Sequence, residues 1–137
     1  MNAKFYLCER CGNLIFKIKD SGMKPYCCGA VMSELFPEHV DGTLSDKHVP
    51  VIECEGKKVH ITIGKEIHPF TEEHHIEWVY VQTDKGGYLR YLNKTEEPKT
   101  CIEICEGEKI EAVYAYCNIH GLWVNRKCVK DGQSGDC

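Results

Sequence analysis

The sequence predicts a mainly β protein, in which a small metal-bound unit comes before an immunoglobulin-like β-sandwich. Cysteines gather near the start of the chain, and short runs rich in β-branched and aromatic residues follow them. We find neither heptads nor a helical periodicity. A chain of 137 residues is long enough for one ordinary core with a small appendage, but too short for two full-sized domains.

Composition divides the chain into three expected segments. Residues 1–36 alternate short apolar pieces with cysteine pairs and glycines, and such a unit is too small to fold by burial alone. A structural metal is the usual remedy, because ligand binding supplies folding free energy. Pro37 opens a polar linker into the sandwich, which we expect over residues 37–127. Residues 128–137 are expected to be a polar, mobile tail.

Seven runs are expected to form the strands of the sandwich. Turn-forming pairs such as Glu55-Gly56 and Glu106-Gly107 separate them at a spacing typical of antiparallel sheets. Seven short strands of this kind indicate an immunoglobulin-like sandwich. The runs are VPVIEC, KVHITIG, HIEWVYVQT, GYLRYLN, TCIEICE, KIEAVYAYC and LWVNRKC.

Charge and hydropathy exclude several classes of partner. The formal net charge is -4 and the acidic and basic residues are interspersed, so no basic block indicates nucleic-acid binding. The first residues carry charges every few positions, where a signal peptide needs an apolar core, and no later stretch has membrane-spanning length. We therefore expect a cytoplasmic protein, in which cysteines are free thiols or metal ligands.

Four cysteines at the front of the chain predict a metal site. The pair Cys8 and Cys11 is followed by the adjacent pair Cys27 and Cys28. Four thiolates suit tetrahedral zinc or iron. Zinc ribbons usually carry a second Cys-x-x-Cys, whereas the second pair here has no spacer and should strain the tetrahedron. Both metals remain open on spacing alone.

The histidines can be sorted by strand alternation. His60 lies between Val59 and Ile61 in an alternating run, so its side chain is expected to face solvent. His74 and His75 are neighbours, so at most one of them faces a common centre, and His39 has no partner at short spacing. The residues that remain as candidate ligands at strand ends or loops are His48, His68, His74, Cys117 and His120.

Five further cysteines fall outside both candidate sites. We expect them to be small, partly buried apolar residues. Cys101 and Cys105 cannot bridge each other in a regular strand, because four residues span about 13 Å and a disulfide needs Cα atoms within roughly 7 Å. The set is Cys54, Cys101, Cys105, Cys128 and Cys137.

Three runs, DKHVPVIE, HPFTEEHHIEWV and CNIHGLW, resemble the iron-binding motifs of superoxide reductases, in the same order. The front segment, YLCERCGN to YCCG, resembles the desulforedoxin module of desulfoferrodoxins, the two-iron class. This resemblance covers nearly everything from Lys4 to Val124. It implies an enzyme that reduces superoxide to hydrogen peroxide, a homodimer, and rubredoxin as the electron donor. The implied iron ligands are His48, His68, His74, His120 and axial Cys117 at the catalytic centre, and Cys8, Cys11, Cys27 and Cys28 at a ferric FeS4 centre.

Two residues before His48 are expected to affect the reaction. Four imidazoles and one thiolate leave one position of an octahedron open for superoxide. Lys47 can place an ammonium near that position and attract an anion, and the resemblance implies the same role. The family usually has glutamate where this chain has Asp46, which is one methylene shorter, so its role as a sixth ligand of resting ferric iron is in doubt.

Two other functions are compatible with these patterns. A zinc-ribbon and β-sandwich interaction module, with incidental histidines, would contain zinc and have no colour. An electron carrier would use only the FeS4 site and leave the histidine site without iron. Iron content and the visible spectrum of the oxidised and reduced protein separate these alternatives.

Overall fold

The computed structural model describes residues 3–37, 48–64, 74–92 and 97–126, together with the backbone of Cys128–Lys130 and Gln133–Gly135. The chain divides into two compact units, Met1–Phe36 and Pro37–Cys137. All the elements with described bounds are β-strands, which confirms the mainly β prediction. Within the described ranges, no helix is long and apolar enough to cross a membrane.

The front unit has a very small core. Strands β1 (Phe5–Leu7), β2 (Leu14–Phe16) and β5 (Ser33–Leu35) form a sheet in the order β2-β1-β5, and β3 (Tyr26–Cys27) pairs with β4 (Ala30–Val31). Its buried cluster consists of Tyr6, Cys8 and Met32, with Cys27 packed against it. Cys8 in this cluster and Cys27 beside it are both candidate metal ligands, so a bound metal would add to the little apolar burial of this unit.

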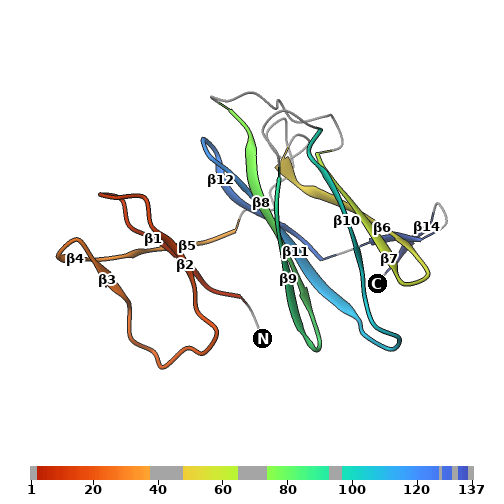
Figure 1. Ribbon diagram of the computed structural model, residues 1–137, viewed down its shortest axis with the longest axis horizontal. Helices are drawn as coiled ribbons and strands as arrows, with labels where there is room; N and C mark the ends of the chain where they lie inside the picture. Colours follow the sequence, from red (N-terminus) through yellow and green to blue (C-terminus); the bar gives the residue numbers. More distant parts are fainter. Residues whose placement is uncertain are drawn as a thin grey trace. The chain divides into compact units, whose positions relative to one another are not determined.

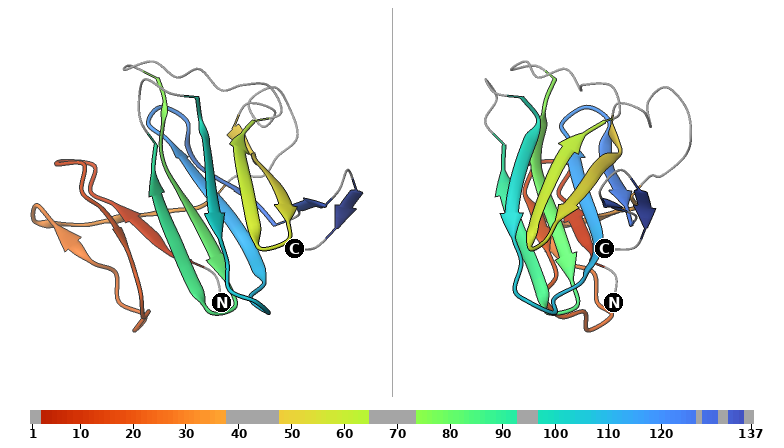
Figure 2. Two further views of the ribbon diagram at one scale, coloured as in Figure 1. Left: turned by 45° about the vertical axis from the view of Figure 1, so that its right-hand side comes forward. Right: turned by 90° about the vertical axis from the view of Figure 1, so that its right-hand side faces the viewer.

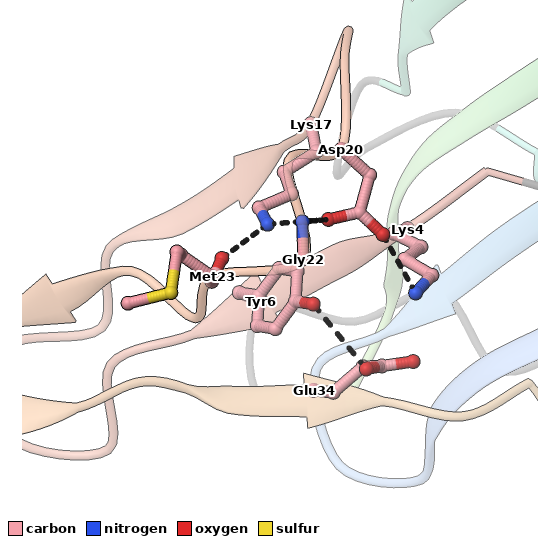
Figure 3. Close-up of polar contacts among 7 residues, drawn as sticks. All are labelled: Lys4, Tyr6, Lys17, Asp20, Gly22, Met23 and Glu34. Atoms are coloured by element: carbon pink, nitrogen blue, oxygen red, sulfur yellow. Dashed lines mark hydrogen bonds and ion pairs between the residues drawn. The ribbon is translucent and has the colours of Figure 1, made fainter.

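Polar contacts around Asp20 organise the loop between β2 and β3. Figure 3 shows the Asp20 carboxylate between Lys4, at 2.8 Å, and Lys17, at 2.7 Å, while the Gly22 N–H donates to it at 2.9 Å. These contacts, the Lys17 hydrogen bond first, hold the pKa of Asp20 well below its usual range. Lys17 also donates to the Met23 carbonyl and lies over the Tyr6 ring, so one side chain joins the loop to the core.

Seven antiparallel strands between Pro50 and Asn125 form two facing sheets (Figure 1). One sheet has the order β10-β7-β6 and the other β12-β11-β8-β9. These strands match the seven predicted runs, and the two-sheet arrangement confirms the predicted sandwich. Their bounds are β6 Pro50–Glu55, β7 Lys58–Ile63, β8 Ile76–Thr83, β9 Gly86–Tyr91, β10 Lys99–Glu103, β11 Ile110–Cys117 and β12 Gly121–Asn125.

Alternating apolar side chains fill the space between the sheets. On β7, the residues Val59, Ile61 and Ile63 are buried and His60 between them is exposed. This confirms that His60 faces away from the core. On the exposed face, its Nε2 lies 3.8 Å from the Glu55 carboxylate. Opposite them, Val79, Val81, Val113 and Ala115 of the second sheet are fully buried. Cys117, at the end of β11, belongs to the same core.

The tail adds two short strands to the first sheet. β13 (Cys128–Lys130) pairs parallel with β6, and β14 (Gln133–Gly135) pairs antiparallel with β13. The polar tail predicted over residues 128–137 thus contributes two short strands. Strand β6 would otherwise be a sheet edge with unpaired N–H and C=O groups, and β13 satisfies that edge. No pattern in the tail sequence indicates its distant partner.

Cys54 also differs from its expected state. Its side chain packs partly buried against the core, as expected, but it is disulfide-bonded, so the expectation that cysteines are free thiols or metal ligands is wrong for Cys54. Cys101 and Cys105 are both free thiols, as expected from their separation along the chain, but both are exposed, so the expectation that they are partly buried is wrong. The side chains of Cys128 and Cys137 lie outside the described residues.

Glu108 connects the strand ends at one end of the sandwich. Its carboxylate accepts hydrogen bonds from the Thr83 hydroxyl, from the Cys105 N–H at 3.0 Å and from the Tyr88 hydroxyl at 2.8 Å. These bonds, that of Thr83 first, hold the pKa of Glu108 below its usual value. Because the pKa is lowered in the folded state, the ionised carboxylate stabilises the fold above the unfolded pKa of about 4.3. That contribution is lost as the pH falls through the folded pKa.

We expect Glu108→Gln to lower the melting temperature at about pH 7 and to have a smaller effect at about pH 3, where the native carboxyl is also becoming neutral. Thermal unfolding followed by circular dichroism at the two pH values measures this. Glu103→Gln, at an exposed position on β10, is the matched control and should change little at either pH. An equal loss for Glu108→Gln at both pH values would contradict the assignment.

Candidate metal centres

The four front cysteines form one cluster. Ligand atoms of Cys8, Cys11, Cys27 and Cys28 all lie within 4.8 Å of one another. The Cys11 and Cys27 sulfurs are 3.5 Å apart, and those of Cys27 and Cys28 are 3.9 Å apart. Two sulfurs bound tetrahedrally to one metal at about 2.3 Å are about 3.8 Å apart, so these sulfurs fit a single ion. The predicted four-thiolate set is thus brought together.

The backbone explains how adjacent cysteines share one centre. Cys28 has a φ of 53°, which is the left-handed region that residues with a Cβ rarely adopt, and Gly29 follows with a φ of 74°. This turn reverses the chain between β3 and β4, whose residues Cys27 and Ala30 are paired. The strain expected for a pair without a spacer therefore lies in the backbone at Cys28. Arg10 steadies the turn by donating to the Cys28 carbonyl at 3.3 Å.

The thiols of this cluster differ in acidity. A hydrogen bond from the Cys11 N–H is the main reason that the pKa of Cys8 falls to about 6. Hydrogen bonds with neighbouring cysteine side chains, that of Cys11 first, raise the pKa of Cys28 to about 12, and the pKa of Cys27 is also raised. The crowded sulfurs thus favour the thiolate at Cys8 and the neutral thiol at Cys27 and Cys28, and a bound cation would favour the thiolate form of all four. Asn13 donates a further hydrogen bond to the Cys27 sulfur at 3.6 Å.

A second cluster lies in the sandwich unit. Ligand atoms of His48, His74, Cys117 and His120 lie within 4.8 Å of one another. The distance from His120 Nδ1 to His48 Nε2 is 3.0 Å, and that from His120 Nδ1 to the Cys117 sulfur is 3.9 Å. Two nitrogens bound at about 2.1 Å and at right angles to each other are about 3.0 Å apart. The pair of histidines therefore fits neighbouring positions around one metal.

Strand ends of both sheets supply these side chains. His48 comes just before β6, His74 just before β8, and Cys117 and His120 flank the turn between β11 and β12. Figure 1 and Figure 2 show the starts of β6 and β8 and the β11–β12 turn at the same end of the sandwich. Residues separated by up to 72 positions in the chain thus meet at one end of a rigid scaffold.

Cys117 is the most enclosed member of the cluster. It is completely buried, and burial is the main reason that the pKa of its thiol is raised. The backbone N–H groups of His120 and Ile119 point at its sulfur and act in the opposite direction. Burial keeps water from the sulfur, while the two amides and a bound cation favour the thiolate. With a cation bound, Cys117 would therefore be a soft thiolate ligand that is protected from water.

Trp123 was given no role from the sequence, yet it contacts two members of the cluster. Its indole stacks on the His48 ring at a centroid distance of 5.0 Å and an interplanar angle of 20°. Its Nε1–H donates to the His120 carbonyl at 3.2 Å. The apolar run Leu122, Trp123 and Val124 on β12 has no alternation, and all three side chains are buried, so no spacing rule indicates the stacking partner.

Of the remaining candidate residues, one belongs to the cluster and the others lie outside it or outside the described residues. His74, not its neighbour His75, belongs to the cluster, and His75 is buried beside it. His68, Lys47 and Asp46 lie outside the described residues, as does His39. The donor set that the structure describes is therefore three imidazoles and one thiolate, which suits iron, zinc or copper by ligand type.

Comparisons with known proteins agree with both clusters. The sequence model of the family described as Desulfoferrodoxin matches residues 41–126. A desulfoferrodoxin homolog from Archaeoglobus fulgidus is 38% identical over 118 residues, which cover 86% of this chain and 92% of that protein. A superoxide reductase from Pyrococcus horikoshii is 41% identical over 98 residues, which cover 58% of this chain and 84% of that protein.

A solved structure extends the likeness to the fold. The crystal structure of the superoxide reductase from Treponema pallidum matches with a TM-score of 0.77 and 27% sequence identity, over 90% of this chain and 97% of that chain. The family match contains the cluster of His48, His74, Cys117 and His120, and the relative from Archaeoglobus fulgidus aligns with 86% of the chain. The chain belongs to the desulfoferrodoxin family.

Proposed function

We propose that this protein is a superoxide reductase, which adds one electron and two protons to superoxide and produces hydrogen peroxide. The observation that carries the proposal is the partly buried cluster of His48, His74, Cys117 and His120 at one end of the sandwich. Relatives named superoxide reductase support the reaction, since they are up to 41% identical to this chain. Iron bound there would supply the electron by passing between its ferrous and ferric states.

Three residues outside the described ranges complete the proposed site. His68 is the fourth imidazole, supported by its place in the run HPFTEEHHIEWV. Lys47 attracts superoxide to the open position, since an anion approaching a protein of net charge -4 needs a local positive field. Asp46 stands where the family usually has glutamate and is one methylene shorter, so a comparison of oxidised wild type with Asp46→Glu tests whether it serves as a sixth ligand.

The described residues prepare the site for this reaction. Neutral imidazoles stabilise a ferrous ion, and the Cys117 thiolate adds negative charge that makes loss of an electron easier. Trp123 covers one face of His48 and so keeps that ring in place. The two N–H groups directed at the Cys117 sulfur limit its charge, so the turn that carries the thiolate also tunes it.

The proposal includes a second iron and a partner. The front cysteines would hold a ferric FeS4 centre, and rubredoxin would deliver electrons in the cytoplasm. Homodimer formation is supported by apolar side chains that the front unit exposes, notably Ile18 at 86%, Met23 at 73% and Tyr26 at 72%. The family resemblance of the front segment supports both the FeS4 centre and the dimer.

Metal analysis and superoxide kinetics test the function together. Protein produced with iron available should carry two irons per chain, and its reduced form should consume superoxide in pulse radiolysis without releasing dioxygen. Peroxide should appear in a one-to-one ratio with the superoxide consumed. Protein with zinc in both centres, or with iron only in the front centre and no reaction with superoxide, would overturn the proposal.

A further inference from the structure

The pairing of β8 with β11 changes register beside the second cluster. Tyr116 pairs with Trp78, but the next residue of β11, Cys117, pairs with Ile76. The ladder thus skips Glu77 on β8, as in a β-bulge. Bulges change the direction of side chains next to functional sites. This bulge shifts the pairing by one residue, so the segment before Ile76 lies one residue further along the β11–β12 turn. The shift determines which residue of β8 lies level with Cys117.

Asn118 continues this pairing beyond the end of β11. Its backbone N–H donates to the His75 carbonyl at 3.2 Å. In return, the His75 N–H donates to the Asn118 side-chain oxygen, Oδ1, at 2.9 Å. The Asn118 side-chain oxygen therefore accepts the hydrogen bond that a backbone carbonyl of β11 would accept if the strand continued. Both backbone groups of His75 are satisfied by one residue of the turn.

The position of this residue connects three members of the cluster. Asn118 lies between Cys117 and His120, while His75 directly follows His74. The His74 and His120 rings lie at a centroid distance of 4.9 Å, with an interplanar angle of 65°. At the backbone level, His75 links this segment to the turn through its two hydrogen bonds with Asn118. The two hydrogen bonds thus join the His74 backbone to the segment that carries the other two ligands.

We propose that Asn118 is a positioning residue, whose side-chain amide locks the His74 segment in register with Cys117 and His120. This role of Asn118 shares one assumption with the proposed function, namely that the second cluster binds a metal. Partners that orient ligands without touching the metal typically change metal affinity by about 10–100-fold when they are removed. Asn118 acts through the backbone of His75, the neighbour of His74. The atom responsible is the side-chain oxygen Oδ1, which accepts the hydrogen bond from the His75 N–H.

Two substitutions isolate that acceptor. Asn118→Ala removes Oδ1 and leaves the backbone hydrogen bond in place. Asn118→Asp keeps an oxygen that can accept from the His75 N–H, and it should therefore keep the register. Gln82→Ala is the matched control, because Gln82 also joins β8 to β11 through a side-chain amide, by donating to Glu111 at 2.9 Å. It lies toward the other end of the same strand pair, away from the cluster.

Titration of the metal-free full chain with Co²⁺, followed by visible absorption, measures the effect without any enzymatic assay. The front cysteines provide an internal reference, because a four-thiolate Co²⁺ site has stronger charge-transfer bands than a mainly imidazole site. We expect Asn118→Ala to weaken Co²⁺ binding at the second cluster by about 10–100-fold, with the front titration unchanged. Asn118→Asp and Gln82→Ala should bind like the wild type.

The outcomes are distinct. Wild-type Co²⁺ affinity in Asn118→Ala would overturn the inference, and so would equal losses in Asn118→Ala and Asn118→Asp. An equal loss in Gln82→Ala would also overturn it, since the effect would then belong to strand pairing in general. If the wild type binds metal at the second cluster but does not reduce superoxide, the proposed function fails and the role of Asn118 stands.

Discussion

Cys117→Ser is expected to abolish the rapid reaction of the reduced protein with superoxide. The serine hydroxyl stays protonated, so the cluster loses its only described anionic ligand. Removal of an orienting partner already costs metal affinity about 10–100-fold, so removal of a direct ligand should cost more than about 100-fold. A buried hydroxyl in place of the sulfur also destabilises the fold by about 1–3 kcal/mol, since Cys117 is fully buried.

Iron content, the visible spectrum of the oxidised protein and pulse radiolysis measure these effects. The sulfur-to-iron absorption of the second centre should disappear, while that of the front centre should persist. Cys101→Ser is the matched control, because Cys101 is a free, exposed thiol on β10 of the same unit. A Cys117→Ser protein that keeps the wild-type rate with superoxide would show that the thiolate is not a ligand.

Cys8→Ser is expected to remove the front metal and to leave the reaction with superoxide largely intact. Cys8 is both a member of the four-cysteine cluster and part of the buried cluster of the front unit. Structural zinc in comparably small units contributes about 10–16 kcal/mol of apparent binding free energy, so loss of the metal should unfold this unit. The reaction with superoxide should stay within about threefold of the wild type, because its ligands all belong to the other unit.

Elemental analysis should find one iron per chain instead of two, and proteolysis should cut within residues 1–36 while sparing the sandwich. Cys105→Ser, at an exposed free thiol, is the control for the substitution itself. Parallel loss of the front iron and of the superoxide reaction would contradict the separation of the two centres. It would mean that the front centre is required for the catalytic site to form.

Local patterns in the sequence predicted the strands and the ligand types. Alternation placed His60 outside and Val59 and Ile61 inside, because side chains of a strand point alternately to its two faces. Turn-forming residues such as Glu55-Gly56 and Glu106-Gly107 separated predicted strands, and paired cysteines predicted the front four-thiolate set that the structure brings together. These features depend on neighbours along the chain, so a single sequence contains them. Motif order then singled out His48, His74, Cys117 and His120.

Contacts between distant segments were decided only by the tertiary structure. The parallel pairing of β13 with β6, the disulfide of Cys54 and the stacking of Trp123 on His48 leave no periodic signal. The same is true of the register shift at Glu77 and the hydrogen bonds of Asn118 with His75. Each depends on how two sheets are placed against each other, and packing of the whole core fixes that placement. The sequence by itself determined which residues are able to bind a metal, and the packed sandwich decided how they are held.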